Sequence, residues 1–566
     1  MGGLATAARM VAGGARVLVL EKYTIPGGSA AYFQRDGYTF DVGSSMMFGL
    51  GDRGTTNLLT ECLRTVGKSV ETVLDPTQLH YHLPRSERHP QGLDVKVWNS
   101  YEAFVAELTS RFPHEAAGIR SFYGDAWKVF NALNAMDLKS LEEPRYLIEQ
   151  LFKSPRGCLS LLGWLPANTG DIARKYISDP ELLRFIDAEC YIFSTVAACA
   201  TPMVTSGMVF SDRHYGGIRY PKGGVGTLAR KLAEGIEQAG GAILYRANAT
   251  CVLFDEAGAA AGVRLSDGRE FRSRAVVSNA TRWDTFGRLL GGREPPEAEK
   301  LFLSRYKKSP SFFSMHLGIR ADVLPPGTEC HHVVVDDWDK MEEARHTLFI
   351  SIPSLLDPSL APDGHHTVHA FTPDWIDAWE GLSPEEYARE KDALCASLLR
   401  RMDARFPGIS SAVTFKEVGT PRTHRRFLGR PDGTYGPIPS RNPLGIITMP
   451  FNTTDVPGLY CVGDSTFPGQ GVNAVVFSGF GCAHRALCDL GLEKSWPLVD
   501  SGYRALIRAA RMAAQKMGPK DGEQEPAEVT RSGAPLGTGA RPPVPVTNNI
   551  ITFAHQPAHV QQQQQQ

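Results

Sequence analysis

The chain has 566 residues, of which 42% are hydrophobic and 21% are charged, close to the averages of globular proteins. Its 60 Lys and Arg residues nearly balance its 61 Asp and Glu residues, which argues against a nucleic-acid-binding protein because such proteins normally carry a basic excess. The ten cysteines form no C-x-x-C pair, so neither a zinc knuckle nor a thioredoxin-type motif is present. No run of 18 or more apolar residues occurs, so we expect no transmembrane helix.

The N-terminal region has the order helix, turn, strand and acid. Residues 2–13 are small and mainly apolar, which favours a helix, and residues 15–21 form a short apolar run that ends in Glu21, as a buried parallel strand would. Glu21 lies 18 residues after Gly3. In dinucleotide-binding units an acid about 20 residues after the glycines binds the ribose hydroxyls. The pattern therefore predicts the back half of a dinucleotide-binding βαβ unit.

The front half of that unit is not in the sequence. A complete unit begins with a strand followed by G-x-G-x-x-G. Met1 stands at the fourth position of this motif, and only Gly3 matches one of its glycines. We therefore expect the first strand and the first two glycines to lie upstream of Met1. The alternative is a protein that departs from the pattern.

The middle of the chain repeats the same order of elements. Residues 221–239 are predicted to form a helix with one apolar face, and residues 242–245 begin a strand. Residues 249–280 alternate in hydrophobicity around a tight turn at Asp267-Gly268, which predicts a β-meander. A second set of nucleotide-binding elements is therefore expected in mid-chain.

The strongest local pattern is the strand that ends in Gly463-Asp464, followed by Gly471-Val472 and a helix over about 473–489. Glycine at a strand end lets a ligand approach the backbone, and the helix N-terminus attracts an anion. Asp464 is placed to accept hydrogen bonds from ribose or ribityl hydroxyls. The alternative is an ordinary strand, turn and helix with Asp464 as an N-cap.

Two long inserts separate the nucleotide-binding segments. The pattern predicts a discontinuous nucleotide-binding domain over 1–65, 220–300 and 415–495, and a second domain over 66–219 and 301–414. The inserts are rich in aromatic residues, most of which should be core, while some could line a channel for a long apolar ligand.

Two further segments stand out by composition. Residues 513–566 are rich in Gly, Pro, Ala and Gln, which is typical of a disordered, low-complexity tail. The apolar segment 157–166 is too short to span a bilayer. It could lie on a membrane surface, although a buried helix is the commoner explanation.

Histidine and basic clusters were considered as metal or nucleic-acid sites. His365, His366 and His369 crowd together, but they fall on a predicted strand rather than at helical spacing, so we expect no metal site there. His331-His332 is a weaker candidate still. Residues 423–426 are basic and are expected to form a solvated turn rather than a nucleic-acid surface.

Taken together, these residues resemble the plant and algal carotenoid isomerases of the phytoene-desaturase-like flavoprotein group. The likeness runs from Met1 to about Lys494. The stretches that carry it are 15–23, 35–45, 212–218, 417–427 and 458–472.

The resemblance implies an α/β fold in which a Rossmann-like FAD-binding domain is joined to a discontinuous α+β substrate domain, as in amine oxidases and phytoene desaturases. Glu21 would bind the adenosine ribose, Gly27 and Gly28 would pack near the pyrophosphate or isoalloxazine, and Asp464 would hold the ribityl-phosphate end. The complete set of expected cofactor residues is Gly2, Gly3, Glu21, Gly27, Gly28, Gly463, Asp464, Gly471 and Val472.

The resemblance also implies an activity and a location. The expected reaction turns poly-cis lycopene into all-trans lycopene with reduced FAD and no net redox change. The expected setting is a plastid, with the enzyme peripheral to the membrane, and no metal or nucleic acid as partner. We hypothesise that Glu417 or Arg422 lies near the flavin, because both precede the second glycine-rich element.

Two other classes of function remain open. One is a redox member of the same group, either a carotenoid desaturase or a retinol saturase, which would differ in the mass of its product. The other is a non-catalytic carotenoid-binding or scaffold protein, which the absent first strand makes plausible.

Overall fold

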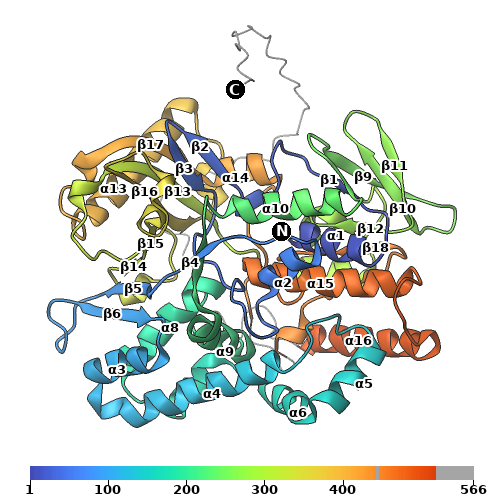
Figure 1. Ribbon diagram of the computed structural model, residues 1–566, viewed down its shortest axis with the longest axis horizontal. Coiled ribbons are helices and arrows are strands. Elements are labelled where there is room, and N and C mark those ends of the chain that lie inside the picture. The colour runs from blue at the N-terminus through green and yellow to red at the C-terminus, as the bar shows by residue number, and fades with distance from the viewer. Residues whose placement is uncertain (441–444, 518–566) are drawn as a thin grey trace, which may run out of the picture. The chain divides into compact units, whose positions relative to one another are not determined.

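The computed structural model describes residues 1–440 and 445–517. Figure 1 shows three groups of elements within it: short parallel strands with covering helices, a long mixed sheet, and a layer of helices below both. Each group draws on segments far apart in the sequence.

The first group combines the N-terminal, middle and late parts of the chain. β1 (Leu18–Leu20) pairs in parallel with β8 (Ala242–Leu244), and β12 (Val276–Ser278) pairs in parallel with β18 (Leu459–Cys461), as two separate two-stranded sheets. The helices that pack on them are α1 (Gly2–Ala12), α10 (Gly226–Gln238) and α15 (Val472–Asp489). The helices predicted over 2–13, 221–239 and 473–489 are thus confirmed, with α10 beginning later than expected.

Close packing of α1 on α15 depends on a glycine. A Cβ atom at Gly479 would lie 2.7 Å from the Cβ of Ala5 and 2.7 Å from the carbonyl oxygen of Gly2. Real Cβ atoms do not approach other atoms so closely, so only glycine allows this helix crossing. The small side chains of the N-terminal segment therefore serve helix–helix contact.

The meander predicted over 249–280 is confirmed for residues 249–272, whereas its last strand, β12, pairs in parallel with β18. β9 (Ala249–Phe254), β10 (Ala260–Leu265) and β11 (Glu270–Arg272) form an antiparallel three-stranded sheet. Gly268, in the turn between β10 and β11, has φ +88°, a conformation that glycine adopts without steric cost.

A hairpin connects the first group to the long sheet. β2 (Tyr32–Arg35) and β3 (Tyr38–Asp41) are joined by Asp36 and Gly37, both with positive φ as a tight two-residue turn requires. β3 lies against strand β16 (His365–Asp374) of the long sheet.

The carboxyl group of Asp41 fastens this hairpin to its surroundings. It accepts hydrogen bonds from Val225 N at 2.8 Å, from the Tyr220 hydroxyl at 2.9 Å and from Ser45 Oγ at 2.8 Å. Burial raises the pKa of Asp41 to about 6. One carboxyl group thus links the hairpin to the start of α10.

The long sheet has seven strands in the order β17-β13-β16-β15-β14-β5-β6, and its neighbours are antiparallel except β14 and β5. Its strands are β5 (Thr77–Leu83), β6 (Leu93–Trp98), β13 (Ser311–Arg320), β14 (His331–Val335), β15 (Thr347–Ser351), β16 (His365–Asp374) and β17 (Val413–Gly419). A further small sheet pairs β4 (Thr72–Leu74) with β7 (Arg219–Pro221).

The helical layer covers one face of β5, β6 and β14. It comprises α3 (Tyr101–Arg111), α4 (Ala116–Asn134), α5 (Pro144–Lys153), α6 (Pro155–Trp164), α7 (Thr169–Arg174), α8 (Pro180–Ser194) and α9 (Met203–Asp212). Phe122, Tyr123 and Phe130 are fully buried there, as expected for core aromatics.

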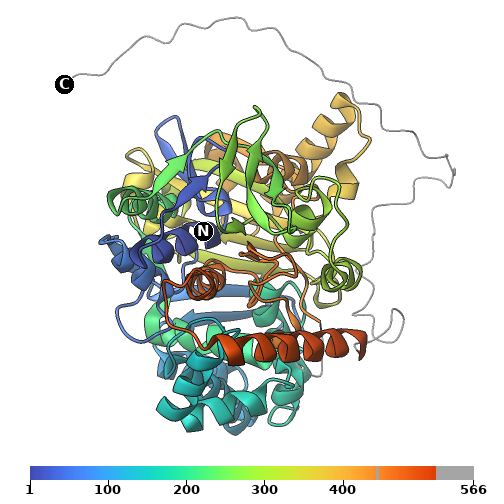
Figure 2. The same cartoon turned by 90° about the vertical axis from the view of Figure 1, so that its right-hand side faces the viewer.

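The remaining helices lie at the margins of these groups. They are α2 (Leu58–Thr65), α11 (Arg282–Gly287), α12 (Glu297–Arg305), α13 (Pro384–Asp403), α14 (Pro421–Leu428) and α16 (Pro497–Met517). Figure 2 shows α16 running between α15 and the helical layer. Within residues 1–440 and 445–517, none of the helices combines the length and the apolar character needed to cross a bilayer.

Two of the predicted domain boundaries fall inside secondary-structure elements. The boundary at 415 falls inside β17, a strand of the long sheet. The tail predicted from 513 overlaps α16, which continues to Met517, so residues 513–517 are helical. The rest of that predicted tail lies outside the described residues.

Candidate functional site

A continuous cavity of about 2160 Å³ lies between the nucleotide-binding elements, the long sheet and the helical layer. One end is lined by strand ends, glycines and the start of α15. The other end is lined mainly by aliphatic and aromatic side chains from the two inserts. The cavity therefore joins a polar, backbone-rich end to an apolar end.

All nine residues predicted to hold the cofactor line this one cavity. Segments more than 400 residues apart meet there, because α1 and α15 pack side by side and β1 and β18 end near them. The nine are Gly2, Gly3, Glu21, Gly27, Gly28, Gly463, Asp464, Gly471 and Val472.

The glycines at the polar end adopt conformations that other residues would not tolerate. Gly27, Gly463 and Gly471 have φ of +115°, +112° and +102°. At Gly27 a Cβ would also lie 2.9 Å from the carbonyl oxygen of Ala30. Gly471 directly precedes the first turn of α15, whose free N–H groups suit a phosphate.

Two polar groups at this end have capacity left for a ligand. Glu21 accepts a hydrogen bond from Tyr23 N at 2.8 Å through Oε1, and within residues 1–440 and 445–517 its Oε2 accepts none. The side-chain oxygen of Asn473 is buried and unpartnered, while its amide nitrogen donates to Thr56 O at 2.9 Å. Together with the glycines, these groups fit a dinucleotide such as FAD.

Asp464 is held by an arginine that sequence reasoning missed. Its carboxylate oxygens accept from the two terminal nitrogens of Arg430 at 2.6 and 3.2 Å, in a bidentate pair. One of those nitrogens also donates to Thr434 O at 2.8 Å. Arg430 follows α14 in an irregular segment, and no local pattern singles it out. Asp464 is thus oriented by a partly buried cation at the cavity wall.

His424 is a second cavity residue whose position the sequence analysis predicted wrongly. The basic cluster at 423–426 was expected to be a solvated turn, but it lies in α14, and His424 is buried and lines the cavity. Its Nδ1 is 3.0 Å from the hydroxyl of Tyr435. Burial lowers the pKa of His424 to about 4, so the ring is neutral near pH 7.

The two predicted catalytic residues do not reach the cavity. Glu417 lies on the edge strand β17 with its side chain 48% exposed, 4.0 Å from Arg35. Arg422 is exposed on α14, and its guanidinium lies over the ring of Tyr387 at 4.7 Å. The structure therefore places both on the outside of the molecule.

The apolar end has an aromatic wall. Phe312, Phe349 and Phe371 come from adjacent strands of the long sheet, with ring centroids 5.0–5.4 Å apart in successive pairs. Phe193 and Phe210 face them from α8 and α9, 5.9 Å apart. Aromatics of the inserts thus line a channel, as the composition of the inserts allowed.

A buried ion pair stands beside this wall. Arg213 donates to Glu189 at 2.5 Å, and both side chains are almost wholly inaccessible to solvent. The other carboxylate oxygen of Glu189 accepts from the hydroxyl of Tyr123. Both charged residues line the cavity.

Asp212 is a second buried acid at the apolar end, and it has no cationic partner among the described residues. It closes α9, just before a π-turn over Arg213–Gly217, a local geometry common at functional sites. Its Oδ1 accepts from Thr56 Oγ1 at 3.2 Å, while its Oδ2 is buried and has no partner among the residues that the structure describes. Burial raises the pKa of Asp212 to about 7. The group therefore carries a proton under conditions in which an ordinary aspartate does not.

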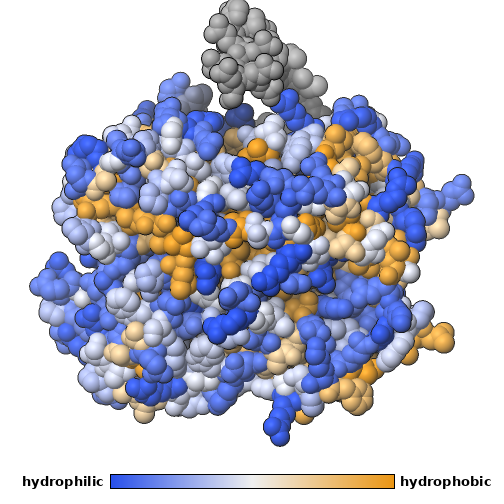
Figure 3. All heavy atoms as spheres, viewed as in Figure 1, coloured by the Kyte–Doolittle hydropathy of each residue, from blue (hydrophilic) through white to orange (hydrophobic). Residues whose placement is uncertain are grey.

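The exposed surface of α5 and α6 is apolar. The segment 157–166 was expected to be a buried helix, but α6 has no buried residue, and Leu159 and Leu162 are 63% and 62% exposed. Phe152 on α5 and Leu498 on α16 are 82% and 95% exposed. Figure 3 shows apolar surface over this region at the lower right. Leu161, Leu162 and Leu165 also line the cavity.

The fold and cavity define a flavoprotein of the flavin containing amine oxidoreductase family, whose sequence model matches residues 1–487. An oxidoreductase from Methanosarcina mazei shares the fold, with a TM-score of 0.57 and 19% identity over 85% of this chain and 96% of that one.

Relatives of higher sequence identity show to which branch of this family the chain belongs. Prolycopene isomerase, chloroplastic, from Arabidopsis thaliana is 56% identical over 91% of this chain and 86% of its own length. The protein of that name from Daucus carota is 53% identical over 90% of this chain and 82% of its own length. The chain belongs to the prolycopene isomerase family, as the sequence resemblance implied.

Proposed function

We propose that this protein isomerises poly-cis lycopene to all-trans lycopene in carotenoid biosynthesis, with FAD as its cofactor. The observation that carries the proposal is the single cavity whose glycine-lined end continues into an aromatic channel. Its volume of about 2160 Å³ is roughly twice the upper range of small-molecule pockets, about 1,000 Å³. Such a cavity has room for a cofactor and a long apolar substrate together.

The chain's own residues would hold FAD by its two polar parts. Glu21 would accept from the adenosine ribose, the start of α15 would face the pyrophosphate, and Asp464, fixed by Arg430, would accept from ribityl hydroxyls. Reduced FAD bound there would supply electron density to the polyene. We propose the reduced form because only an electron-rich flavin could give that density, and its return after rotation leaves no net change of oxidation state.

Isomerisation by protonation needs a group beside the substrate that can donate a proton to the polyene and take it back. Rotation about a polyene C=C bond requires transient loss of double-bond order, which protonation of one carbon provides. Asp212 holds a proton in the cavity wall, and the unpartnered Oδ2 is the atom from which it can be given and to which it can return. The proton is recovered after rotation, so the product has the mass of the substrate.

The location follows from the relatives and from the surface. Because the relatives are named chloroplastic, we place the protein in plastids. The apolar surface of α5 and α6 would rest on the membrane, with the basic side chains Arg145, Lys153 and Arg156 near its lipid headgroups. The cavity walls formed by α6 would then open toward the lipid that holds the carotenoid.

The deciding experiment is an anaerobic incubation of the protein with FAD, a reductant and poly-cis lycopene, followed by chromatography and mass spectrometry of the product. All-trans lycopene of unchanged mass is expected. A product two hydrogens lighter or heavier would instead make the protein a desaturase or a saturase. Carotenoid that binds but never reacts, in a chain that also binds FAD, would make it a binding protein.

A further inference from the structure

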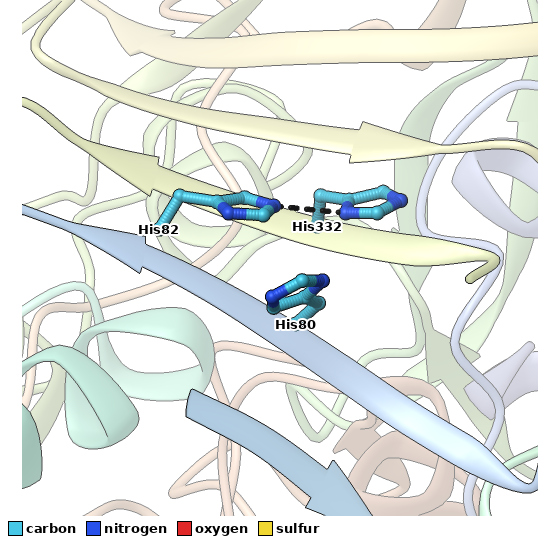
Figure 4. Close-up of side chains that lie close together, drawn as sticks. All are labelled: His80, His82 and His332. Carbon is cyan, nitrogen blue, oxygen red and sulfur yellow. Dashed lines mark hydrogen bonds between the residues drawn. The ribbon is translucent and has the colours of Figure 1, made fainter. Parts of the chain in front are cut away.

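Three histidines outside the cofactor end of the cavity converge on one face of the long sheet. His80 and His82 are two residues apart on β5, so their side chains share a face, and His332 of the neighbouring strand β14 is paired with His80. One ring nitrogen from each lies within 4.8 Å of one from each of the others. Figure 4 shows the rings of His82 and His332 nearly coplanar and edge to edge, with His80 beside them.

The outer nitrogen of each ring already has an acceptor. His82 Nδ1 is 2.6 Å from Asp94 Oδ1, and His332 Nε2 is 2.8 Å from the carbonyl oxygen of Glu329. His80 Nδ1 is 3.1 Å from the carboxylate of Glu329, and its Nε2 is 3.4 Å from Asp94 Oδ1. A carbonyl or an ionised carboxylate can only accept, so these outer nitrogens carry the protons.

The inner nitrogens of His82 and His332 are therefore the lone-pair atoms of neutral rings. They lie 3.0 Å apart and face each other. In a neutral ring the outer nitrogen holds the one N–H, so neither of these inner nitrogens carries a proton. Two lone pairs that face each other at this distance repel, and a cation between them removes the repulsion.

This pattern is how proteins hold transition metals. A metal-binding imidazole typically donates its other N–H to a carboxylate or a backbone carbonyl, which fixes the ring and its tautomer. Tetrahedral coordination at about 2.0–2.1 Å would separate two nitrogens by roughly 3.3 Å, a few tenths more than is seen here. A small rotation of either ring supplies that difference.

The surroundings allow a divalent cation to enter. A recess of about 430 Å³ leads to the histidines past the loop of residues 325–329. Its charged groups are Asp94, Glu329, Glu107, Lys96, Arg111 and Arg405. Lys96 is paired with Glu329 and Arg111 with Glu107, while Asp94 is 41% exposed and faces the rings.

A second group of possible metal ligands is less suited to bind an ion that enters from solvent. Asp75, Cys330 and His331 also lie close together, but all three are buried. None of the three lines the recess that leads to His80, His82 and His332.

We propose that His80, His82 and His332 form a binding site for a divalent transition-metal ion, best suited to Zn²⁺, with Asp94 and Glu329 as the groups that orient the rings. His80 would coordinate through Nε2, since its Nδ1 faces Glu329. Three imidazoles leave a fourth position for water. The ion would join β5 to β14, the parallel pair that links the first insert to the second.

The test uses the full chain stripped with a chelator and then titrated with Co²⁺ and Zn²⁺. Co²⁺ should bind at one equivalent with the intense visible absorption of a four-coordinate ion, and Zn²⁺ should displace it. His82→Asn and His332→Asn should each weaken binding at least about 100-fold, and Asp94→Asn about 10–100-fold. His365→Asn, on β16, is the matched control and should bind as the parent does.

Every result of these titrations either supports or contradicts the proposed metal site. If His82→Asn or His332→Asn does not fold, as judged by circular dichroism, the partly exposed Asp94→Asn variant provides the same comparison. Zn²⁺ should also raise the thermal midpoint of the parent and of His365→Asn, but not of the ring variants. Absence of saturable binding, or equal affinity in Asp94→Asn and His365→Asn, would overturn the proposal.

Discussion

The two ends of the cavity are built by different means. At the cofactor end the backbone forms most of the wall, through glycines of positive φ at strand ends and the start of α15. At the apolar end side chains form the wall, drawn from helices and strands that are far apart in the chain. A backbone site leaves a local pattern of glycines in the sequence, whereas a side-chain site is created only when the chain folds.

The largest expected effect is at the apolar end. Asp212→Asn keeps the shape of the side chain but removes the acid, so we expect the isomerisation rate to fall by about 10²–10⁴-fold while FAD affinity is unchanged. In the parent the rate should fall as the pH rises through about 7, because the raised pKa of Asp212 keeps it protonated only below that pH.

The control is Glu417→Gln on the exposed edge strand, which should leave the rate unaltered. Equal losses in both variants, or a parent pH profile that is flat around 7, would remove Asp212 from the mechanism. A loss in Glu417→Gln alone would restore the hypothesis made for Glu417 from the sequence.

The two ion pairs, one at each end, give the next comparison. Arg213→Met leaves the carboxylate of Glu189 buried without its cation, and we expect the free energy of unfolding to fall by about 3–5 kcal/mol in a denaturant titration. The Arg430–Asp464 pair is more accessible, so Arg430→Met should cost less stability and should instead weaken FAD binding.

The double variant Arg213→Met, Glu189→Met separates charge from packing. Because it leaves no buried charge, it should recover part of the stability lost in Arg213→Met. No recovery would mean that Arg213 acts through its contacts with Phe104 and Phe210 rather than through the ion pair.

A smaller effect is expected from backbone strain at the cofactor end. Gly463→Ala places a side chain at φ +112°, which should cost roughly 1–2 kcal/mol of stability and reduce FAD affinity. Gly124→Ala, in the middle of α4 with open space at its Cβ, should instead be neutral or stabilising by up to about 1 kcal/mol. Fluorescence titration with FAD and thermal unfolding measure both variants.

The smallest effect on stability is expected at the apolar surface of α5 and α6. Leu159→Gln with Leu162→Gln changes only exposed side chains, so the free energy of unfolding should shift by no more than about 0.5 kcal/mol. Binding to lipid vesicles in a flotation assay should fall at least about tenfold, since each leucine contributes about 1.5–3 kcal/mol on leaving water. Unchanged flotation would place the membrane contact elsewhere.

The comparison of the two ends also explains what the sequence could predict. Gly463, Asp464, Gly471 and Glu21 were recognisable because strand, turn and helix follow one another within a few residues. That local order gave the α/β class and the elements around the cofactor end.

Asp212 was not recognisable as a cavity acid, because its environment comes from Thr56 and from helices distant in sequence. Likewise no local sequence pattern relates His82 to His332. They are 250 residues apart in sequence and come close in space only because β5 and β14 pair. The exposure of Leu159 was predicted wrongly because an apolar run does not reveal which side of the protein it faces.

The contact between α1 and α15 sets the order in which this protein can be completed. Thr6 Oγ1 is 3.3 Å from the carbonyl oxygen of Gly479, a separation of 473 residues along the chain. At about 5–20 residues per second, a ribosome needs roughly 25–95 s to make that interval. Throughout that time α1 lacks the helix that covers it most extensively, although α2 and α10, which also contact α1, are made earlier. The surface of α1 that α15 covers therefore stays exposed until the end of synthesis.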